Sequence, residues 1–183
     1  ARLPQGKSRF VRSADTYHSF AAVYAHEPQV LLKGDFARHG HTGFAWAARR
    51  EVIQAHGLYD AMIAGSGDHV MAHAFAGDFS SRCVRRILGD NERHIAHFQA
   101  WARSVYPSVR GRMAALEGRV LHLWHGATEN RRYVERNREL AAFQFDPGKD
   151  LVRDGNGLWS WRRKRRRLTD WATQYFAHRR EDG

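Results

Sequence analysis

The sequence contains a single cysteine, fewer acidic than basic residues and no long apolar run. Because Cys83 is the one cysteine, an intrachain disulfide and a zinc site made of cysteines alone are both excluded. No apolar stretch approaches the ~20 residues that span a bilayer, and no signal-peptide pattern begins the chain. We therefore expect a soluble protein of a reducing compartment, by default the cytoplasm, with no transmembrane segment.

Motifs of several nucleotide-binding enzyme classes are also missing. The chain has no Walker-type phosphate loop, no dinucleotide-binding fingerprint and no internal repeat. Its 183 residues, 43% of them apolar and 12% aromatic, suit one globular domain over residues 1–183 and exclude a disordered chain. Because the sequence begins with Ala1 and not with methionine, we expect a trimmed chain or a piece of a longer one.

The formal net charge of +11 needs a partner or a structural reason. Much of the excess lies in residues 162–167, beside Trp159 and Trp161, and basic residues next to aromatics can bind phosphates and stack on bases. Against this, the run continues from Leu168 as an amphipathic helical pattern, so it could be the solvated start of a docked helix. A nucleic-acid-binding module therefore remains an alternative.

The segment 41–76 carries the clearest local patterns. Phe44 and Trp46 alternate with alanines, and this period of two predicts a strand with a buried face. Residues 50–56 then predict a short helix that ends at Gly57.

A Gly-rich bend and an acidic residue follow in the same segment. Residues 65–67, Gly-Ser-Gly, allow the backbone to turn sharply. Asp68 should cap a helix whose buried side includes Val70 and Ala74. A carboxylate placed at a helix start after such a bend can face a pocket without being buried in the core, which is what a general base needs.

The other patterns predict mostly helices, with short strands between them. Apolar periodicity and turn residues place helices at 19–25, within 80–117 and at 129–142, with Gly89 ending one piece and Pro107 beginning another. The expected strands are 30–33 and 119–124, the segment 145–150 is expected to be a turn, and 151–153 should pair with 158–161 as a hairpin.

Two histidine pairs could be metal ligands, but each has a plainer explanation. His39 and His41 flank a glycine on a loop, where two imidazoles make only part of a site. More often one such histidine packs inside and the other is exposed to solvent. His94 and His97 lie on the edge of an apolar helical stripe, which favours core and rim positions over metal binding.

A third pair, His122 and His125, lies at the end of the predicted strand 119–124. A side chain just past a strand end can turn toward a cleft at the carboxyl edge of a sheet. A metal-dependent hydrolase is therefore a second alternative. Its ligands would be drawn from His39, His41, His122, His125 and Asp68.

One set of motifs resembles a known family. It comprises a G-x-x-W-x-x-R strand, a short helix ending in glycine, a turn before an aspartate, and a Gly-rich loop followed by an acidic residue. The matching positions are Gly43, Phe44, Trp46, Arg49, Arg50, Gly57, Leu58, Tyr59, Asp60, Gly65, Gly67 and Asp68. They resemble the acceptor-side half of GT-A glycosyltransferases of the galactosyltransferase-like group. The resemblance implies an α/β fold: a partial GT-A mixed sheet flanked by helices, with a helix-rich C-terminal part.

The resemblance also implies residue roles. The positions concerned are Asp68 as catalytic base; Phe44, Trp46 and Gly67 in acceptor binding; Arg49 and Arg50 at the donor phosphates; and His122 and His125 as ligands of Mn²⁺ or Mg²⁺. The chain departs from the family at one point. The family has two or three consecutive acidic residues where this sequence has Asp68-His69.

A GT-A enzyme further needs an N-terminal nucleotide-binding half with a D-x-D motif, through which a divalent cation holds the donor diphosphate. No Asp-x-Asp occurs in this sequence. We therefore expect the acceptor-side portion of a split or truncated glycosyltransferase, inactive without its other half. The complete enzyme would transfer a sugar from a nucleotide-diphosphate sugar to a hydroxyl acceptor, with inversion.

Overall fold

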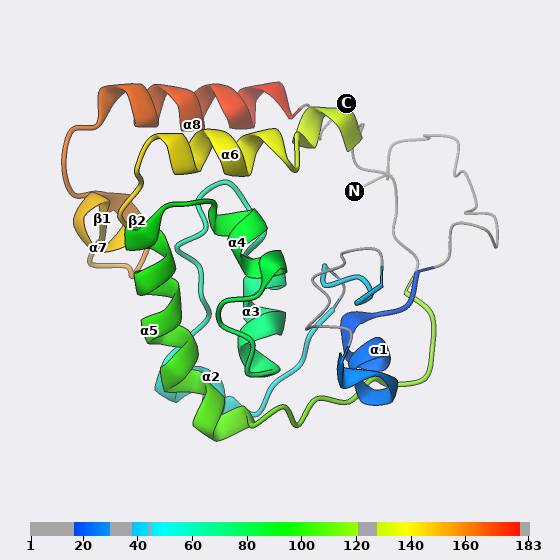
Figure 1. Cartoon of the computed structure of the whole chain (residues 1–183). Coiled ribbons are helices and arrows are strands. Elements are labelled where there is room, and N and C mark those ends of the chain that lie inside the picture. Colours follow the sequence, from blue (N-terminus) through cyan, green and yellow to red (C-terminus); the bar gives the residue numbers. More distant parts are fainter. Residues whose placement is uncertain (1–16, 30–37, 44, 121–127, 180–183) are drawn as a thin grey trace, which may run out of the picture.

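The computed structural model describes residues 17–29, 38–43, 45–120 and 128–179. Within these ranges the protein is rich in helix and contains one small two-stranded antiparallel sheet (Figure 1). The α-helices are α1 (Phe20–His26), α2 (Arg50–His56), α3 (Gly67–Phe75), α4 (Arg82–Leu88), α5 (Glu92–Val109), α6 (Glu135–Ala142), α7 (Pro147–Asp150) and α8 (Arg166–His178). The 3₁₀ helix η3 (Thr128–Arg131) precedes α6, and the strands are β1 (Leu151–Arg153) and β2 (Trp159–Trp161).

The main core lies between α3, α4 and α5. On α5 the buried residues Ile95, Phe98, Ala102 and Val105 recur every three or four positions, which places them on one face of the helix. Tyr59, from the segment between α2 and α3, is buried against this face and lies edge-on to Phe98. Burial of these apolar side chains supplies most of the driving force for packing the three helices.

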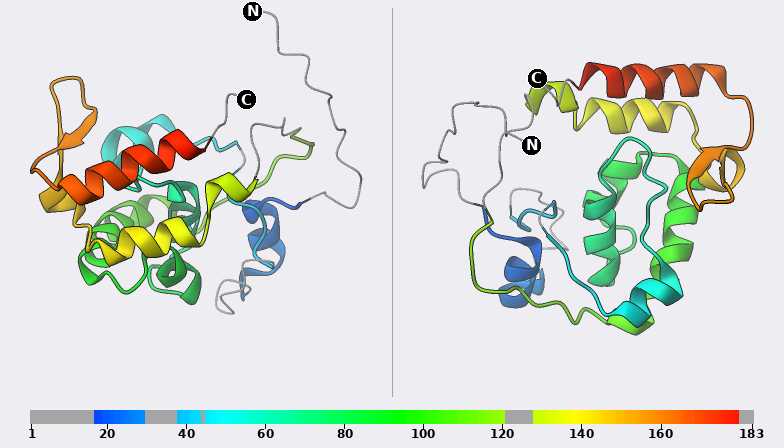
Figure 2. Two further views of the ribbon diagram at one scale, coloured as in Figure 1. Left: turned by 90° about the horizontal axis from the view of Figure 1, so that it is seen from above. Right: turned by 180° about the vertical axis from the view of Figure 1, so that it is seen from behind.

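Two antiparallel helices, α6 and α8, form a second layer that crosses above α3, α4 and α5 in the view of Figure 1 and stays side by side in both views of Figure 2. Polar contacts join the pair: the indole of Trp171 donates to Glu139 at 2.7 Å, and Arg136 donates to the hydroxyl of Tyr175 at 2.8 Å. The buried Leu140 and Leu168 complete the layer, one from each helix.

The hairpin β1–β2 forms where the sequence predicts it. Leu151 pairs with Trp161 and Arg153 with Trp159, and Asp154 closes the turn by accepting from the amides of Asn156 and Leu158. The hairpin is fixed to the core through Asp60. Its carboxylate accepts from the guanidinium of Arg153 and from the indole of Trp159 at 2.8 Å.

Several helix predictions are confirmed. Ser19 caps α1 by accepting from the amide of Ala22, and α2 spans the predicted residues 50–56 and stops at Gly57. Gly89 separates α4 from α5 as expected. None of the described helices combines the length and the apolar composition that crossing a bilayer requires.

The predicted mixed sheet is not present in the described residues. Apart from the hairpin, their one strand-like pairing is an isolated bridge between Ser19 and His41. Residues 45–49 are exposed and belong to no strand. Within the described ranges no strand pairs with them, and without a partner strand their backbone groups are not satisfied by a sheet. Arg119 and Val120 likewise lie outside any strand; the rest of 119–124, and all of 30–33, fall outside the described residues.

Two helix boundaries were predicted wrongly because of proline. Pro107 lies inside α5, near its end, and does not begin a new helix; the helix continues to Val109 and stops where Arg110 adopts a left-handed conformation. Pro147 begins α7, a single helical turn, where a turn without helix was expected. Proline suits this first helical position, since its missing N–H would have no helical partner there.

The predicted helix 129–142 is divided in two. The 3₁₀ helix η3 ends at Arg131, and Arg132 has a positive φ of 45°, so the α-helix begins only at Glu135. Tyr133, which belongs to the predicted helix, falls in the break and is 45% exposed.

The acidic residue with the most cationic contacts is Asp150, at the end of α7. Its fully buried carboxylate contacts Arg163 at 2.6 Å and Arg165 at 2.8 Å, and it accepts from the amide of Asp146. Burial acts to raise the pKa of Asp150, but these hydrogen bonds outweigh burial and hold the pKa below its usual value. Two arginines of the basic run therefore have an internal structural role.

Replacing Asp150 with asparagine should lower the free energy of unfolding by about 2–3 kcal/mol, since breaking a buried ion pair leaves cations unmatched and Arg163 is partly exposed. Chemical denaturation would measure this. The control is Asp170→Asn, which breaks the exposed pair with Arg166 and should change stability by less than about 0.5 kcal/mol. Equal effects of the two substitutions would contradict the structural role of Asp150.

A buried histidine gives a second prediction. His94 lies against Phe145 in the core, and burial, followed by the nearby His97, lowers its pKa to about 3 from 6.5. Between pH 6.5 and about pH 3, His94 is therefore protonated in the unfolded chain but neutral in the folded chain. Stability should fall with decreasing pH in this window, by up to about 1.4 kcal/mol per pH unit.

In His94→Gln this part of the pH dependence should disappear. Unfolding free energies from about pH 7 to about pH 4 would measure the slope. His69 contributes a slope of the same sign in both proteins, and His97 and Tyr59 are the other titratable groups that face His94. An unchanged slope in the variant would show that folding does not lower the pKa of His94.

Candidate functional site

Four buried side chains from three segments converge beside α1. They are His39, His69, His73 and Cys83, here called the histidine–cysteine cluster. Each offers one nitrogen or sulfur atom, and these atoms all lie within 4.8 Å of one another. The imidazole rings also contact one another, with the centroids of His69 and His73 4.7 Å apart.

Helix α3 brings the two central histidines together. His69 and His73 are four residues apart, so they lie one turn apart on the same face of the helix. The neighbouring helix α4 supplies Cys83 from its first turn, after Ser81 caps it by accepting from the amide of Val84. The packing of α4 against α3 therefore places the thiol beside the imidazoles.

The third histidine comes from a loop held against α1. Two backbone hydrogen bonds join His41 to the start of α1. Its amide donates to the carbonyl oxygen of His18, and its carbonyl oxygen accepts from the amide of Phe20. Gly40 makes this possible, since its φ is +80° and a Cβ there would lie 2.8 Å from the carbonyl oxygen of Ser19. The loop thereby buries His39 to 2% exposure and leaves His41 exposed, as expected for a His-Gly-His loop.

Hydrogen bonds outside the cluster orient two of its rings. Nδ1 of His73 lies 2.7 Å from the carboxylate of Asp78, and Nδ1 of His39 lies 2.8 Å from the carbonyl oxygen of Gly40. Because both partners are acceptors, each Nδ1 carries the proton and each Nε2 presents a lone pair. Nε2 of His73 is buried and has no hydrogen-bond partner.

Burial favours the neutral form of the His69 imidazole. Burial, with smaller contributions from His73 and His39, lowers the pKa of His69 to about 2. Burial also acts to raise the pKa of Asp78, but hydrogen bonds from His73 and Ser81 outweigh it and keep this carboxyl ionised. Neutral imidazole nitrogens and a thiol are the donors that bind borderline-soft metal ions, so the cluster could hold a transition metal.

Asp68, the predicted catalytic base, lies directly before the cluster on α3. The sequence predicted that Asp68 caps this helix, but Ser66 takes that position in a left-handed conformation and Asp68 falls in the first turn. Its Oδ2 accepts from the hydroxyl of Thr42 at 3.0 Å, and among the described residues its Oδ1 accepts nothing. The side chain is half-buried.

The predicted acceptor residue Trp46 is linked to Asp68 through Thr42. Its indole donates to the carbonyl oxygen of Thr42 at 2.8 Å, while the Thr42 hydroxyl contacts the carboxylate. Trp46 is 42% exposed and lies edge-on to Phe75 of α3. Gly67, also predicted in acceptor binding, begins α3 immediately before Asp68. These three predicted residues are therefore brought together.

A buried arginine supports the bend before Asp68. Arg136 of α6 donates to the hydroxyl of Ser66 at 2.8 Å, and its guanidinium lies against Gly65, where a Cβ would approach it to 3.0 Å. A side chain at residue 65 would push this guanidinium away. The second helix layer thus fixes the start of α3.

The other predicted site residues are two exposed arginines and three residues outside the described ranges. Arg49 and Arg50 are exposed, and the nearest acidic group to Arg49 is Glu51 at 3.9 Å. Phe44, His122 and His125 lie outside the described residues, so their placement stays a prediction.

The basic segment also differs from a nucleic-acid interface. Arg163 and Arg165 bind Asp150, and Arg162 donates to the carbonyl of Leu151. Trp159 and Trp161 are both half-buried against the core, and the guanidinium of Arg153 lies over the ring of Trp159, 4.1 Å from its centre. Part of the segment therefore attaches β2 and α8 to the rest of the domain, while Lys164, Arg166 and Arg167 are exposed.

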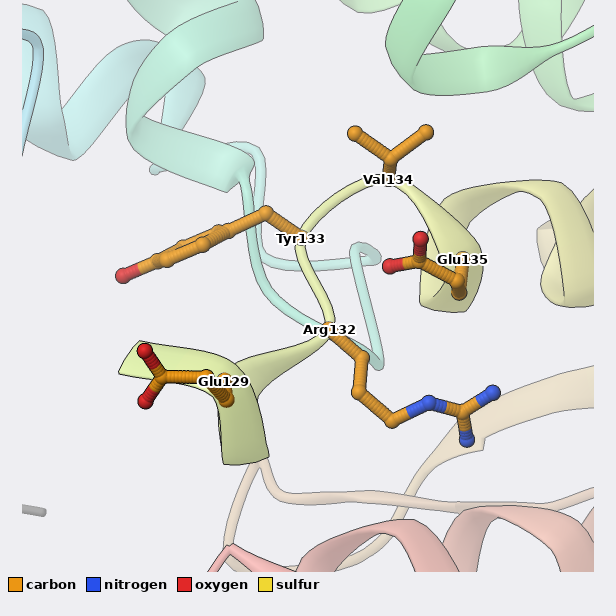
Figure 3. Close-up of a pocket in the computed structure, with 5 residues that line it drawn as sticks. All are labelled: Glu129, Arg132, Tyr133, Val134 and Glu135. Carbon is orange, nitrogen blue, oxygen red and sulfur yellow. The ribbon is translucent and has the colours of Figure 1, made fainter. Parts of the chain in front are cut away.

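A surface hollow exists at the junction between η3 and α6. It is lined by Glu129, Arg132, Tyr133, Val134 and Glu135 (Figure 3). Arg132 forms an ion pair with Glu139 on α6. The hollow is open and contains none of the predicted site residues, so we assign it no role.

Sequence reasoning did not identify the cluster. The sequence patterns group His39 with His41, and both with His122, His125 and Asp68 in a hydrolase, but they predict no site that contains His73 or Cys83. The available signal was the spacing of His69 and His73 at i and i+4 within a predicted helix, because this spacing puts two imidazoles on one face. His69 is also the residue that stands where the resembled family has a second acid.

No family model, no curated protein and no solved structure matches this chain.

Proposed function

We propose that this chain is the acceptor-side half of a glycosyltransferase that uses nucleotide-diphosphate sugars. The observation that carries the proposal is the Thr42-linked pair of Asp68 and Trp46 at the start of α3. Through Thr42, hydrogen bonds connect a carboxylate to an exposed aromatic side chain. The resemblance of the surrounding motifs to GT-A enzymes supports the same proposal.

The carboxylate is suited to the part of a general base. Oδ2 is held by Thr42, which fixes the orientation of the group, and Oδ1 is available to a substrate hydroxyl. In the proposed reaction the acceptor oxygen attacks the anomeric carbon and the bond to the diphosphate breaks. The diphosphate leaves with the bonding electrons, Asp68 takes the hydroxyl proton, and the anomeric configuration is inverted.

The exposed indole is suited to binding the acceptor. A sugar ring presents an apolar face of C–H groups, which packs well on an aromatic surface. Trp46 cannot turn freely, because its N–H is bonded to Thr42 and its edge contacts Phe75. A fixed aromatic next to a carboxylate would hold a sugar with one hydroxyl directed at Asp68.

Residues other than Asp68 and Trp46 must bind the nucleotide-diphosphate sugar. The sequence has no Asp-x-Asp motif, so the proposal assigns nucleotide binding to a second half of the enzyme. The resemblance implies that His122 and His125 help to hold Mn²⁺ or Mg²⁺, and that Arg49 and Arg50 contact the donor phosphates. These assignments remain proposals.

The two alternative functions have less support. A polyanion-binding module would need the segment 162–167 to be available, whereas Arg163 and Arg165 bind Asp150. A hydrolase would need a metal open to water, whereas the clustered histidines are buried, and His41 is not among them.

Replacing Trp46 with alanine should weaken binding of simple glycans by about tenfold or more, since loss of an aromatic contact of ~1.5 kcal/mol or more has that effect. Titration of the whole chain with a panel of oligosaccharides, followed by NMR shifts, would measure it. The matched control is Phe176→Ala, an exposed aromatic on α8, which should bind as the unchanged protein does. Equal affinities for all three proteins would remove Trp46 from the acceptor site.

Replacing Asp68 with asparagine, in an enzyme that contains both halves, should reduce kcat by about 10²–10⁴-fold and leave donor affinity intact, because only proton removal is lost. Steady-state transfer assays with UDP- and GDP-sugars would measure it. Asp90→Asn, an exposed acid after α4, is the control. A rate that Asp68→Asn leaves unchanged would exclude this residue as the base.

A further inference from the structure

We propose that His39, His69, His73 and Cys83 bind one Zn²⁺ ion in a closed, structural site. The site would join the 38–42 loop to α3 and α4, and it is distinct from the Mn²⁺ or Mg²⁺ site that the resemblance implies at His122 and His125. It does not depend on the proposed sugar transfer. The argument rests on ligand geometry, on ring orientation and on the chemistry of the donor set.

The ligand atoms are close to the geometry of a zinc site. Four ligands at about 2.0–2.3 Å from a tetrahedral Zn²⁺ stand about 3.3–3.7 Å from one another. In the cluster the corresponding nitrogen and sulfur atoms already lie within 4.8 Å. Side-chain shifts of about 1 Å or less would bring them to tetrahedral distances.

The tautomers are set for metal binding. Asp78 accepts from Nδ1 of His73, and the carbonyl of Gly40 accepts from Nδ1 of His39, so in a neutral ring the lone pair lies on Nε2, the atom that would bind the metal. A carboxylate behind a ligating imidazole is the recurrent outer partner of zinc histidines. Asp78 is itself fixed, since the amide of Ser81 donates to its other oxygen at 2.9 Å.

Ordinary core packing accounts poorly for His73. Its side chain is completely buried, and its Nε2 has no hydrogen-bond partner, which costs a protein stability unless something satisfies the atom. The Nε2 of His94 is also buried without a hydrogen-bond partner, but the rings packed against His94 include the aromatic side chains of Phe145 and Tyr59. What distinguishes His73, within the part of the chain that the structure describes, is that two further imidazoles and a thiol surround it.

The donor set and its burial select zinc in a structural role. Three imidazoles and one thiolate suit a borderline-soft ion, and four protein ligands leave no position for water or substrate. On binding, the Cys83 thiol gives its proton to solvent, and the ion keeps one uncompensated positive charge. The ionised Asp78, in contact with His73, lies where it offsets that charge.

The test uses the whole chain, stripped of metal and titrated with Zn²⁺ against a chromophoric chelator, and separately with Co²⁺. We expect one ion per chain, tetrahedral ligand-field absorption and a thiolate-to-cobalt charge-transfer band. Cys83→Ser should abolish that band. A folded, unchanged chain that binds no ion stoichiometrically, or binds Co²⁺ without the thiolate band, would overturn the proposal.

Two histidine variants separate loss of a ligand from loss of stability. His73→Ala should reduce zinc affinity by at least 100-fold, whereas His94→Gln, an equally buried position outside the cluster, should keep full stoichiometry. His41→Ala, two residues from His39, should also keep it. Equal zinc affinity in all three variants and the unchanged chain would overturn the assignment, whatever the variants do to the stability of the fold.

Asp78→Asn tests the orienting hydrogen bond. Its amide oxygen can still accept from the Ser81 amide, but it no longer provides a negative charge to His73. We expect a 10–100-fold loss of zinc affinity with the cobalt spectrum retained, as for other outer partners of metal-bound histidines. An affinity equal to that of the unchanged chain would show that Asp78 only holds the turn before α4 and would overturn its role as a positioning residue.

Discussion

The contact on which the candidate site depends is the 2.7 Å hydrogen bond between His73 and Asp78. It spans the turn from α3 to α4, and it orients a completely buried imidazole. Through Asp78 the turn is also fastened to the start of α4, which carries Cys83. One carboxylate therefore determines both the direction of a ligand atom on α3 and the position of a thiol on α4.

Similar buried polar contacts hold the other layers. Arg136 joins α6 to Ser66 and so sets the start of α3, while Asp150 gathers Arg163 and Arg165 between the hairpin and α8. Such groups are costly to bury and costly to disrupt, so they make one arrangement of helices preferable to others. The position of Asp68 depends on one of these contacts, since Arg136 donates to Ser66, the residue that caps the helix carrying Asp68.

Local features of the fold could be predicted, whereas its long-range contacts could not. Ser19, Gly57 and Gly89 determine helix ends through neighbouring backbone atoms, and the turn at Asp154 is equally local. The prediction of a strand around Trp46 was wrong because a strand needs a partner strand, and the alternation of aromatic residues with alanines says nothing about whether one is present. The cluster was missed for the same reason: His39 and Cys83 meet α3 only after the chain has folded.

X-ray absorption at the zinc edge would test the structural claim most directly. The zinc-loaded chain should show three nitrogen ligands at about 2.0–2.1 Å and one sulfur at about 2.3 Å. Imidazole scattering should persist in Cys83→Ser, with the sulfur contribution gone. A first shell of oxygen and nitrogen atoms without sulfur in the unchanged chain would contradict the site, and would return Cys83 and its three histidines to the role of core residues.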